Sequence, residues 1–506
     1  METRSAKRKK QLCFPPGNDD GGASQIDRIT DLPDPLLHHI LSYLPIRSIA
    51  QTSALSRRWR LLWSTLPDLD FTTAAAAIKR SSIPPNSYIS TVLSLRHKHS
   101  DLRSLRFSAR LTFSTLNSLI RLAVRHRVQY LDVEVSTDDY FNFPRGVIAS
   151  ETLRTFKLKS RCPGFRLLPS SVMAGGFRNL DSLSLSLVTL HDQQSSLLDL
   201  FTETSFPCLR KLDLDTCFEL RHLKVGCRAL EDFSIENCFH LRGLEICCAK
   251  LTSLRVASCF DAYCDETRVE IRNGSRIRFV AWEQNAITGK SAVEELRAVR
   301  EASIGFFVDD YDDICSDKLQ SVCSFMSGFS RADSLTLDSQ CIEILSSSKY
   351  SAHFVHPIFS DVRTLELHTG FNKKNVAGLA FLFRSTPTLH TLVLKIMNDH
   401  KTERRQWNKD LWDVANCEQE QYWESQVQSL SSFLNHLKIV KIYGFLEYEN
   451  EVSLAKFLLK HGKDLQEMTL STPHHCNYRD SLRRQKVRSQ MMGFSWASSN
   501  AKISFQ

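Results

Sequence analysis

The chain has 506 residues, of which 42% are hydrophobic and 24% are charged, and its formal net charge is +9. Such a composition is ordinary for a globular protein of about three domains, or for one elongated repeat structure with additions. No run of about 18 apolar residues occurs, which argues against a membrane-spanning helix, and the charged N-terminus lacks the apolar core of a secretory signal. The 15 cysteines, an odd number, indicate free thiols in a reducing compartment, so we expect the nucleus, the cytoplasm or both.

Residues 1–24 are charged and then rich in Gly, Asp and Pro, and we expect them to form a disordered basic tail. They contain four adjacent cations, Lys7, Arg8, Lys9 and Lys10. Such a run suits the acidic groove of a nuclear-import receptor, and it is also common on solvated surfaces. Nucleic-acid binding is not expected, because no stripe of interleaved aromatic and basic side chains accompanies the charge.

Residues 25–71 carry the densest apolar pattern of the chain and predict three short helices. Asp34 is expected to cap the first helix, with Pro35 in its first turn, where a missing N–H costs nothing. Pro45 ends that helix, and Ser56 is expected to cap the third. A segment this short rarely buries so much apolar surface by itself. The apolar residues at helical spacing are Leu36, Leu37, Ile40, Leu41 and Leu44 in the first helix and Trp59, Leu62 and Trp63 in the third.

A repeat of the form L-x-x-L-x-L, with other apolar residues substituting, dominates the chain past residue 100 and predicts a solenoid over 80–430. The spacing is typical of leucine-rich repeats, in which each coil contributes one short strand and returns on the convex side. Stacking stabilises the array, because a single coil cannot bury its own apolar face. Copies begin at Leu102, Val128, Leu153, Leu180, Leu209, Leu230 and Leu251, and again at Val362, Leu389, Leu437 and Leu465.

Between Leu209 and Leu251 the repeat returns every 10 or 11 residues, which is too short for a complete coil. We therefore pair these units into coils of 21 residues, so that the half-repeats at Leu220 and Leu241 form strands on the opposite wall. The longer early repeats have room for a helix there instead. Charged residues such as Arg210 lie beside the predicted strands without an evident cluster in the sequence.

Three cysteines, Cys217, Cys238 and Cys259, are 21 residues apart and occupy the Asn/Cys position of the repeat consensus. We expect them to turn inward and to donate weakly to backbone carbonyls. A zinc site would need close C-x-x-C pairs with matching partners, which the spacing does not provide, so no metal and no cofactor is expected.

Motifs for catalysis fail when their spacing is examined. The string Thr288-Gly289-Lys290-Ser291 is similar to the end of a phosphate-binding loop, but Gln284 stands where the first glycine is required. No G-x-S-x-G, H-E-x-x-H or G-x-G-x-x-G occurs, so no catalytic residue is assigned and the protein is not expected to be an enzyme.

The N-terminal segment resembles an F-box from Leu32-Pro33 to Ser56-Arg57-Arg58-Trp59. In that family the three helices dock onto a Skp-type adaptor, which tethers them to a cullin–RING ubiquitin ligase, the SCF complex. The resemblance implies that the excess apolar surface is half of an intermolecular core; the alternative is packing within the domain. The implied adaptor-binding residues are Leu32, Pro33, Leu36, Ile40, Leu41, Leu44, Leu55, Trp59 and Leu62. The last three are expected to be shared between the adaptor face and packing within the domain.

The C-terminal segment, 431–506, resembles the FBD unit of plant F-box/leucine-rich-repeat/FBD proteins, through Phe433–Phe445 and Leu454–Leu470. Its pattern predicts strand, helix and strand, and we expect these closing repeats to cap the solenoid, because an exposed terminal strand invites aggregation. Ala497–Phe505 is similar to the family's final strand, although Trp496 stands where a smaller or charged residue is expected.

An insert at 398–425 breaks the repeat rhythm, and we expect an exposed loop there. Its tryptophans, Trp407, Trp412 and Trp423, suit either a contact with a partner or buried packing.

These patterns together predict an α/β protein with a three-helix F-box, a leucine-rich-repeat solenoid (horseshoe) and closing FBD repeats. The resemblance implies a non-catalytic substrate-recognition subunit of an SCF E3 ubiquitin ligase, which binds the adaptor through the F-box and a target protein through the repeats. The alternatives are an interaction scaffold or a ligand-sensing receptor that is not coupled to ubiquitination. The sequence does not identify the target.

Overall fold

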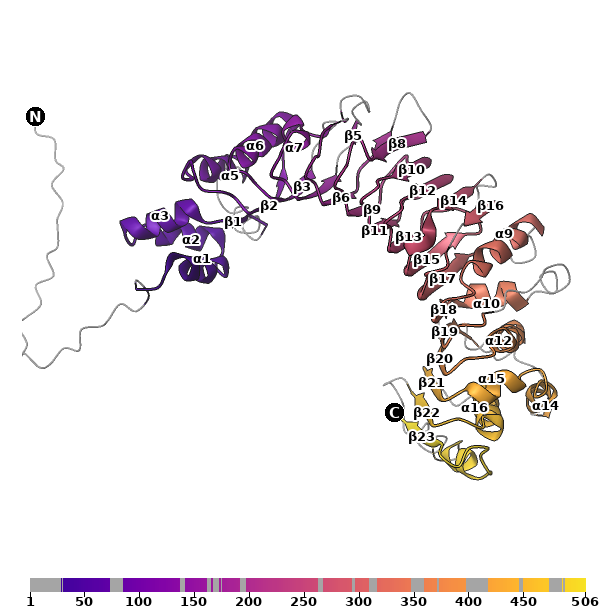
Figure 1. Ribbon diagram of the computed structural model, residues 1–506. Helices are drawn as coiled ribbons and strands as arrows, with labels where there is room; N and C mark the ends of the chain where they lie inside the picture. The colour runs from indigo at the N-terminus through magenta and orange to yellow at the C-terminus, as the bar shows by residue number, and fades with distance from the viewer. Residues whose placement is uncertain are drawn as a thin grey trace, which may run out of the picture.

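In the computed structural model the chain forms an open arc, with three helices at its N-terminal end and the C-terminus at the other end (Figure 1). A 16-stranded parallel sheet lines the concave side. The predicted α/β solenoid is therefore confirmed. The structure describes residues 29, 31–72, 85–136, 142–161, 165–166, 173, 175–191, 197–262, 267–293, 296–308, 316–346, 359–370, 373–396, 417–445, 449–472, 485 and 487–506.

The N-terminal helices are α1 (Asp34–Ser42), α2 (Ile46–Thr52) and α3 (Arg57–Thr65). Ser56 caps α3 as predicted, because its side chain accepts a hydrogen bond from the Trp59 amide at 3.3 Å. The predicted cap at Asp34 is wrong: Pro33 precedes α1, and the Asp34 carboxylate pairs with Arg58 at 2.7 Å. The predicted tail 1–24 and its cations Lys7–Lys10 lie outside the described residues, so nuclear import stays a prediction.

Apolar and polar side chains alternate along the concave strands, as the L-x-L pattern requires. Neighbouring strands pair in register, so that Leu212, Phe233 and Leu254 form one buried row. The strands, in their order across the sheet, are β1 (Asp68–Asp70), β2 (Ser104–Arg110), β3 (Tyr130–Ser136), β4 (Thr155–Arg161), β6 (Ser182–Ser186), β9 (Lys211–Asp215), β11 (Asp232–Glu236), β13 (Ser253–Ala257), β15 (Phe279–Ala286), β17 (Glu301–Phe307), β18 (Ser334–Leu337), β19 (Thr364–Thr369), β20 (Thr391–Ile396), β21 (Ile439–Tyr443), β22 (Glu467–Ser471) and β23 (Lys502–Phe505).

The convex wall changes along the arc: helices cover both ends, and a second parallel sheet covers the middle (Figure 1). The half-repeats predicted at Leu220 and Leu241 are confirmed, because they form β10 (His222–Gly226) and β12 (Gly243–Cys247) of that five-stranded sheet. Its other strands are β8 (Leu197–Thr202), β14 (Arg268–Arg272) and β16 (Lys290–Val293), and the short strands β5 (Phe165–Arg166) and β7 (Leu190–His191) pair nearby. The helices are α5 (Pro85–Ser94), α6 (Phe113–Arg125), α7 (Arg145–Ile148), α9 (Ser316–Ser327), α10 (Ser339–Ser346), α12 (Lys373–Ser385), α14 (Cys417–Ser425), α15 (Ser431–His436) and α16 (Glu449–His461), with a 3-10 turn at Gly274–Arg276.

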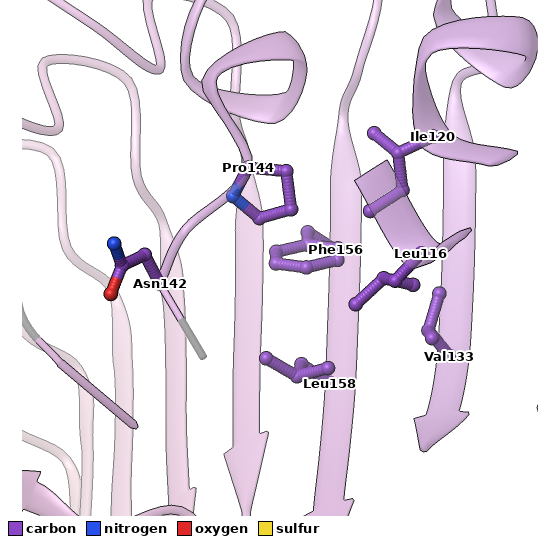
Figure 2. A pocket seen from close by; sticks show the side chains of 7 residues that line it. All are labelled: Leu116, Ile120, Val133, Asn142, Pro144, Phe156 and Leu158. Carbon is purple, nitrogen blue, oxygen red and sulfur yellow. The ribbon is translucent and has the colours of Figure 1, made fainter. Parts of the chain in front are cut away.

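Helix α6 packs tightly on the sheet, as Figure 2 shows. Its Leu116 and Ile120 lie over Phe156 and Leu158 of β4, and these side chains leave no volume for a water molecule between them. The convex side therefore has no ligand cavity at this point.

Four coils were not predicted from the sequence. Three of them have Ala, Val, Ile or Trp in place of leucine at key positions, whereas the fourth, Leu66-Leu69-Phe71, has the same pattern as the predicted copy at Leu102 and lies within the segment assigned to the N-terminal helices. They form β1, β15, β17 and β18, and all of their key side chains are buried. The missed units are Leu66-Leu69-Phe71, Ile277-Val280-Trp282, Val299-Ala302-Ile304 and Ala332-Leu335-Leu337.

The repeated cysteines turn inward, as predicted. The Cys259 thiol donates to the carbonyl oxygen of Ile235, in the preceding coil, at 3.4 Å. Cys248 lies on the opposite wall, and burial raises the pKa of its thiol to about 12. Burial also raises the pKa of the Cys259 thiol, whereas hydrogen bonds from the Cys217 and Cys259 thiols lower the pKa of Cys238. All of these cysteines are small buried side chains of the core.

The insert is partly helical, so the prediction of a loop over 398–425 is wrong for its last nine residues, which form α14. Trp423 is only 2% exposed and stacks on Phe457 and Phe383, with ring centroids 5.5 and 6.1 Å away. Buried packing is therefore the correct alternative for this side chain. Trp407 and Trp412 lie outside the described residues.

Replacing Trp423 by alanine is expected to lower the local unfolding free energy of the C-terminal coils by about 3 to 5 kcal/mol, because the stacked rings lose a large buried partner. Hydrogen exchange of α14 and α16 measures this effect. Gln421→Ala on the exposed side of α14 is the matched control and should change exchange little. Equal exchange in both variants would contradict the packing role.

The C-terminal repeats confirm the predicted order of strand, helix and strand in β21, α16 and β22. The final strand is also present, since β23 pairs with β22 from Lys502 to Phe505. Trp496 does not displace it: its indole N–H donates to the carbonyl oxygen of Met491 at 3.0 Å.

Candidate functional site

The three-helix bundle leaves a group of large apolar side chains exposed along α1 and the turn that follows it. Leu36, Ile40 and Leu44 follow one another at intervals of four residues, and they are 51%, 47% and 43% exposed. Leu36 and Ile40 therefore share one side of α1, and Leu44 lies in the turn that follows the helix. Leu55, at the end of the turn before α3, is also exposed. No described part of the solenoid covers these residues.

Other residues of the implied adaptor set lie elsewhere. Leu41 and Leu62 are buried in the core of the bundle with 1% of their surface exposed. Leu62 therefore takes the internal packing that was one of its two expected roles, whereas the prediction that Leu41 faces the adaptor is corrected, because its side chain packs inside the bundle. Leu32 and Trp59 are half-buried, and Pro33 is exposed.

Two exposed apolar residues of the bundle were missed, Tyr43 and Leu61. Successive residues of a helix point about 100° apart. Because Leu62 points into the bundle, its neighbour Leu61 could have been predicted to point outward. The exposed apolar surface is therefore larger than the sequence predicted.

Hydrogen bonds hold the bundle in shape. Arg58 of α3 bonds to the Asp34 carboxylate, and a ring nitrogen of His38 lies 3.1 Å from the carbonyl oxygen of Leu62. Both contacts tie α1 to α3. A rigid surface loses little conformational entropy when a partner binds.

A buried arginine joins the bundle to the solenoid. Arg96 donates hydrogen bonds to the carbonyl oxygens of Leu66, just after α3, and of Asp101, just before β2. Burial lowers the pKa of Arg96 to about 10, so its guanidinium stays charged at neutral pH. These contacts connect the residue that follows α3 to the first coils of the solenoid.

A groove of about 450 Å³ opens between the bundle and the first concave strands. Two of its charged residues are paired with each other, since Arg103 donates to Asp68, while Asp70 accepts from the backbone amide of Thr72 at 2.8 Å. The lining residues are Ser42, Leu44, Ile46, Ile49, Asp68, Leu69, Asp70, Arg103, Ser104, Arg106 and Tyr130.

The concave face begins with a basic region on β2 to β4. Arg106 and Lys157 lie over the ring of Tyr130, with their charged atoms 5.0 and 5.8 Å from its centroid. Lys159 on β4 pairs with Glu134 on β3 at 3.8 Å.

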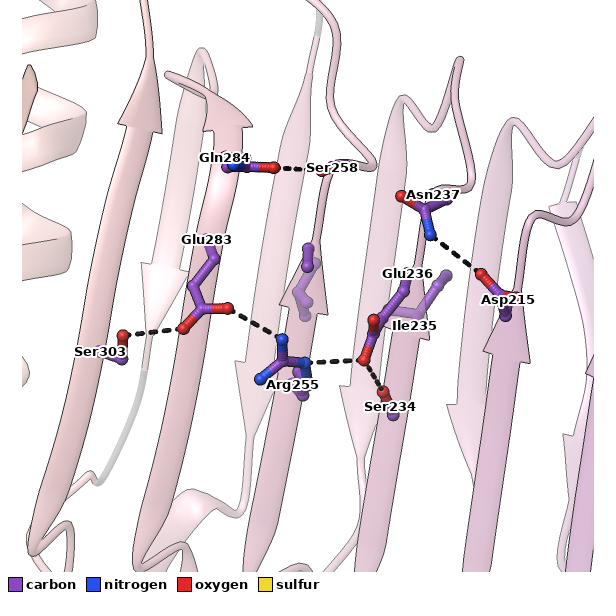
Figure 3. A network of polar contacts seen from close by, with 12 residues as sticks. Asp215, Ser234, Ile235, Glu236, Asn237, Arg255, Ser258, Glu283, Gln284 and Ser303 are labelled. Atoms are coloured by element: carbon purple, nitrogen blue, oxygen red, sulfur yellow. Dashed lines mark hydrogen bonds and ion pairs between the residues drawn. The ribbon is translucent and has the colours of Figure 1, made fainter. Parts of the chain in front are cut away.

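The centre of the concave face carries a polar network that crosses from strand to strand (Figure 3). Arg255 on β13 bridges Glu236 on β11, at 2.7 Å, and Glu283 on β15, at 3.0 Å. Ser303 on β17 donates to Glu283 at 2.8 Å. The sheet therefore brings together charged residues that lie far apart in the sequence.

The described residues contain no group of three His, Cys, Asp or Glu side chains suited to a metal ion. Within the same residues, every helix is too short or too polar to cross a bilayer.

Comparisons with known proteins match the same three regions. The F-box domain model matches residues 29–70, a leucine-rich-repeat model described as At1g61320/AtMIF1, LRR domain, matches 94–301, and the FBD model matches 429–470. An F-box followed by a leucine-rich-repeat solenoid and an FBD unit thus defines the class of protein.

Two curated relatives carry names that contain the same three parts. The chain is 50% identical over 510 residues to At4g03220 of Arabidopsis thaliana, named as an F-box/FBD/LRR-repeat protein, and the match covers 100% of both chains. It is 25% identical over 456 residues to the F-box/FBD/LRR-repeat protein At3g26920 of the same plant, covering 88% of this chain and 90% of the relative. The chain belongs to the F-box/FBD/LRR-repeat family.

Proposed function

We propose that this protein is the substrate-recognition subunit of an SCF-type E3 ubiquitin ligase. The bundle α1 to α3 binds a Skp-type adaptor, and through it a cullin–RING ligase, while the concave sheet binds a target protein. The observation that carries the proposal is the exposed apolar row Leu36, Ile40 and Leu44 in a domain that matches the F-box model. Exposed apolar side chains gathered in this way are typical of a protein interface.

Such a subunit acts by proximity and needs no catalytic group of its own. Holding the target beside a charged ubiquitin-conjugating enzyme raises the effective concentration of the target's lysines. The Arg96 contacts support this role, because they connect the end of the bundle to the solenoid that would hold the target.

Reconstitution tests the proposal. The purified full-length chain is mixed with a Skp-type adaptor and then with a cullin–RING pair, and the mixture is separated by size-exclusion chromatography. We expect one complex that contains all components. If the adaptor elutes separately, the chain is a scaffold that is not coupled to the ligase.

A further inference from the structure

The middle of the concave sheet differs in charge from the rest of the protein. We call the outward face of β9, β11, β13, β15 and β17 the central concave surface. No described element covers it, and carboxylates outnumber cations on it, although the net charge of the whole chain is +9. The outward charged residues are Asp213, Asp215, Asp232, Glu236, Glu283 and Glu301 against Lys211 and Arg255.

Two of these carboxylates are held by neutral hydrogen-bond donors, while the nearby cations Lys211 and Lys159 act on them only through longer-range attraction. Asp213 accepts from Ser184 at 3.0 Å, and Asp215 accepts from Ser186 and Asn237 at 3.0 Å. Burial acts to raise the pKa of Asp215, but these donated hydrogen bonds lower it on balance. The carboxylate is therefore fixed in position and ionised at neutral pH.

Exposed phenylalanines follow the same strands at one edge of the surface. Phe218 and Phe239 occupy equivalent positions in consecutive coils, just after β9 and β11, and Phe307 ends β17. They are 45%, 52% and 46% exposed. The core does not require them, since they are solvated in the chain alone. The in-register pairing of β9 and β11 brings Phe218 and Phe239 to the same end of the sheet, and Phe307 lies at the corresponding end of β17, beyond a register shift in its pairing with β15.

We propose that the central concave surface binds a basic segment of the target protein, rich in lysine and arginine, whose apolar side chains pack on the phenylalanine edge. This inference rests on the proposed function and names the chemistry of the target. Five strands about 4.8 Å apart span about 19 Å, the length of about six extended residues. A nucleic acid does not fit, because its phosphates would face carboxylates.

The test measures the binding of fluorescent probe peptides to the full-length chain by anisotropy. The basic probe repeats Lys, Arg, Lys and Leu for about three cycles, and the acidic probe replaces each cation by Glu. We expect the basic probe to bind at least about tenfold more tightly, and more weakly as salt rises. General attraction to a chain of net charge +9 would give the opposite order.

Two variants locate the site. The triple variant Asp213→Asn/Asp215→Asn/Glu301→Gln should bind the basic probe about tenfold more weakly than the wild type. The control variant Asp132→Asn/Glu134→Gln, on β3 of the same sheet face, should bind the probe with unchanged affinity. The variant Phe218→Ser/Phe239→Ser should have a lower affinity for the basic probe. Its affinity for a basic probe with glycine in place of leucine should be unchanged. Unchanged thermal midpoints show that the variants fold.

Tighter binding of the acidic probe or of a single-stranded DNA probe overturns the inference, and so does equal binding of the basic probe to the triple variant and the wild type. Adaptor co-elution is measured on the same preparations. Absence of adaptor binding with intact peptide binding would contradict the proposed function alone. Intact adaptor binding without preference for the basic probe would contradict this inference alone.

Discussion

Replacing both Ile40 and Leu44 by aspartate is expected to abolish adaptor binding, with a loss of affinity of at least about a hundredfold. Both side chains are nearly half exposed in the chain alone, so aspartate is solvated there and the bundle keeps its fold. In the complex each carboxylate would be buried in an apolar interface without a partner. Surface plasmon resonance against the immobilised adaptor measures the change.

Leu95→Asp is the matched control, because Leu95 is 64% exposed and lies outside the bundle, at the end of α5. Its affinity for the adaptor should equal that of the wild type. A third variant, Leu41→Asp, places the same charge in the bundle core and should unfold the bundle. Retention of the adaptor by the double variant would contradict the assignment of this face.

Replacing Asn285 by alanine is expected to lower the local stability of the solenoid by about 3 kcal/mol, because it leaves buried backbone groups without partners. The Asn285 side chain is fully buried and accepts from the amides of Cys259, at 2.9 Å, and Phe260, at 3.3 Å. Its amide group also donates to the carbonyl oxygen of Val256 at 2.9 Å. Hydrogen exchange at the Cys259 and Phe260 amides measures the loss.

Asn237→Ala provides the comparison for this prediction. Asn237 is half-buried, and its side chain donates to the Asp215 carboxylate at 3.0 Å, where water can replace it. We expect a loss below about 1 kcal/mol. Similar exchange rates in the two variants would show that the buried hydrogen bonds of Asn285 do not stabilise the neighbouring coils.

The adaptor face shows where sequence reasoning reaches its limit. Helical spacing identified the apolar row of α1, but it could not separate Ile40 from its neighbour Leu41, because both belong to one apolar stripe about 100° wide. Packing of α3 against α1 decided that Leu41 is core and Ile40 is surface. The inward position of Leu62 likewise left Leu61 outside.

The central concave surface was not visible in the sequence for a different reason. Asp213, Glu236 and Glu283 are separated by tens of residues, and each stands beside an ordinary strand pattern. Only the register of β9, β11 and β15 places their side chains on one face. Which residues meet across the sheet depends on how many residues form the convex part of each coil.

The sequence by itself determined the order of parts: three helices, stacked coils and a closing strand–helix–strand unit. It also determined the thin middle of the solenoid, because 21 residues leave no room for a helix between successive strands. These features are local, so periodicity and turn chemistry are enough to define them. The tertiary structure alone decided which apolar side chains stay exposed, where Trp423 packs and which charges meet, because burial and proximity depend on elements that lie far apart in the chain.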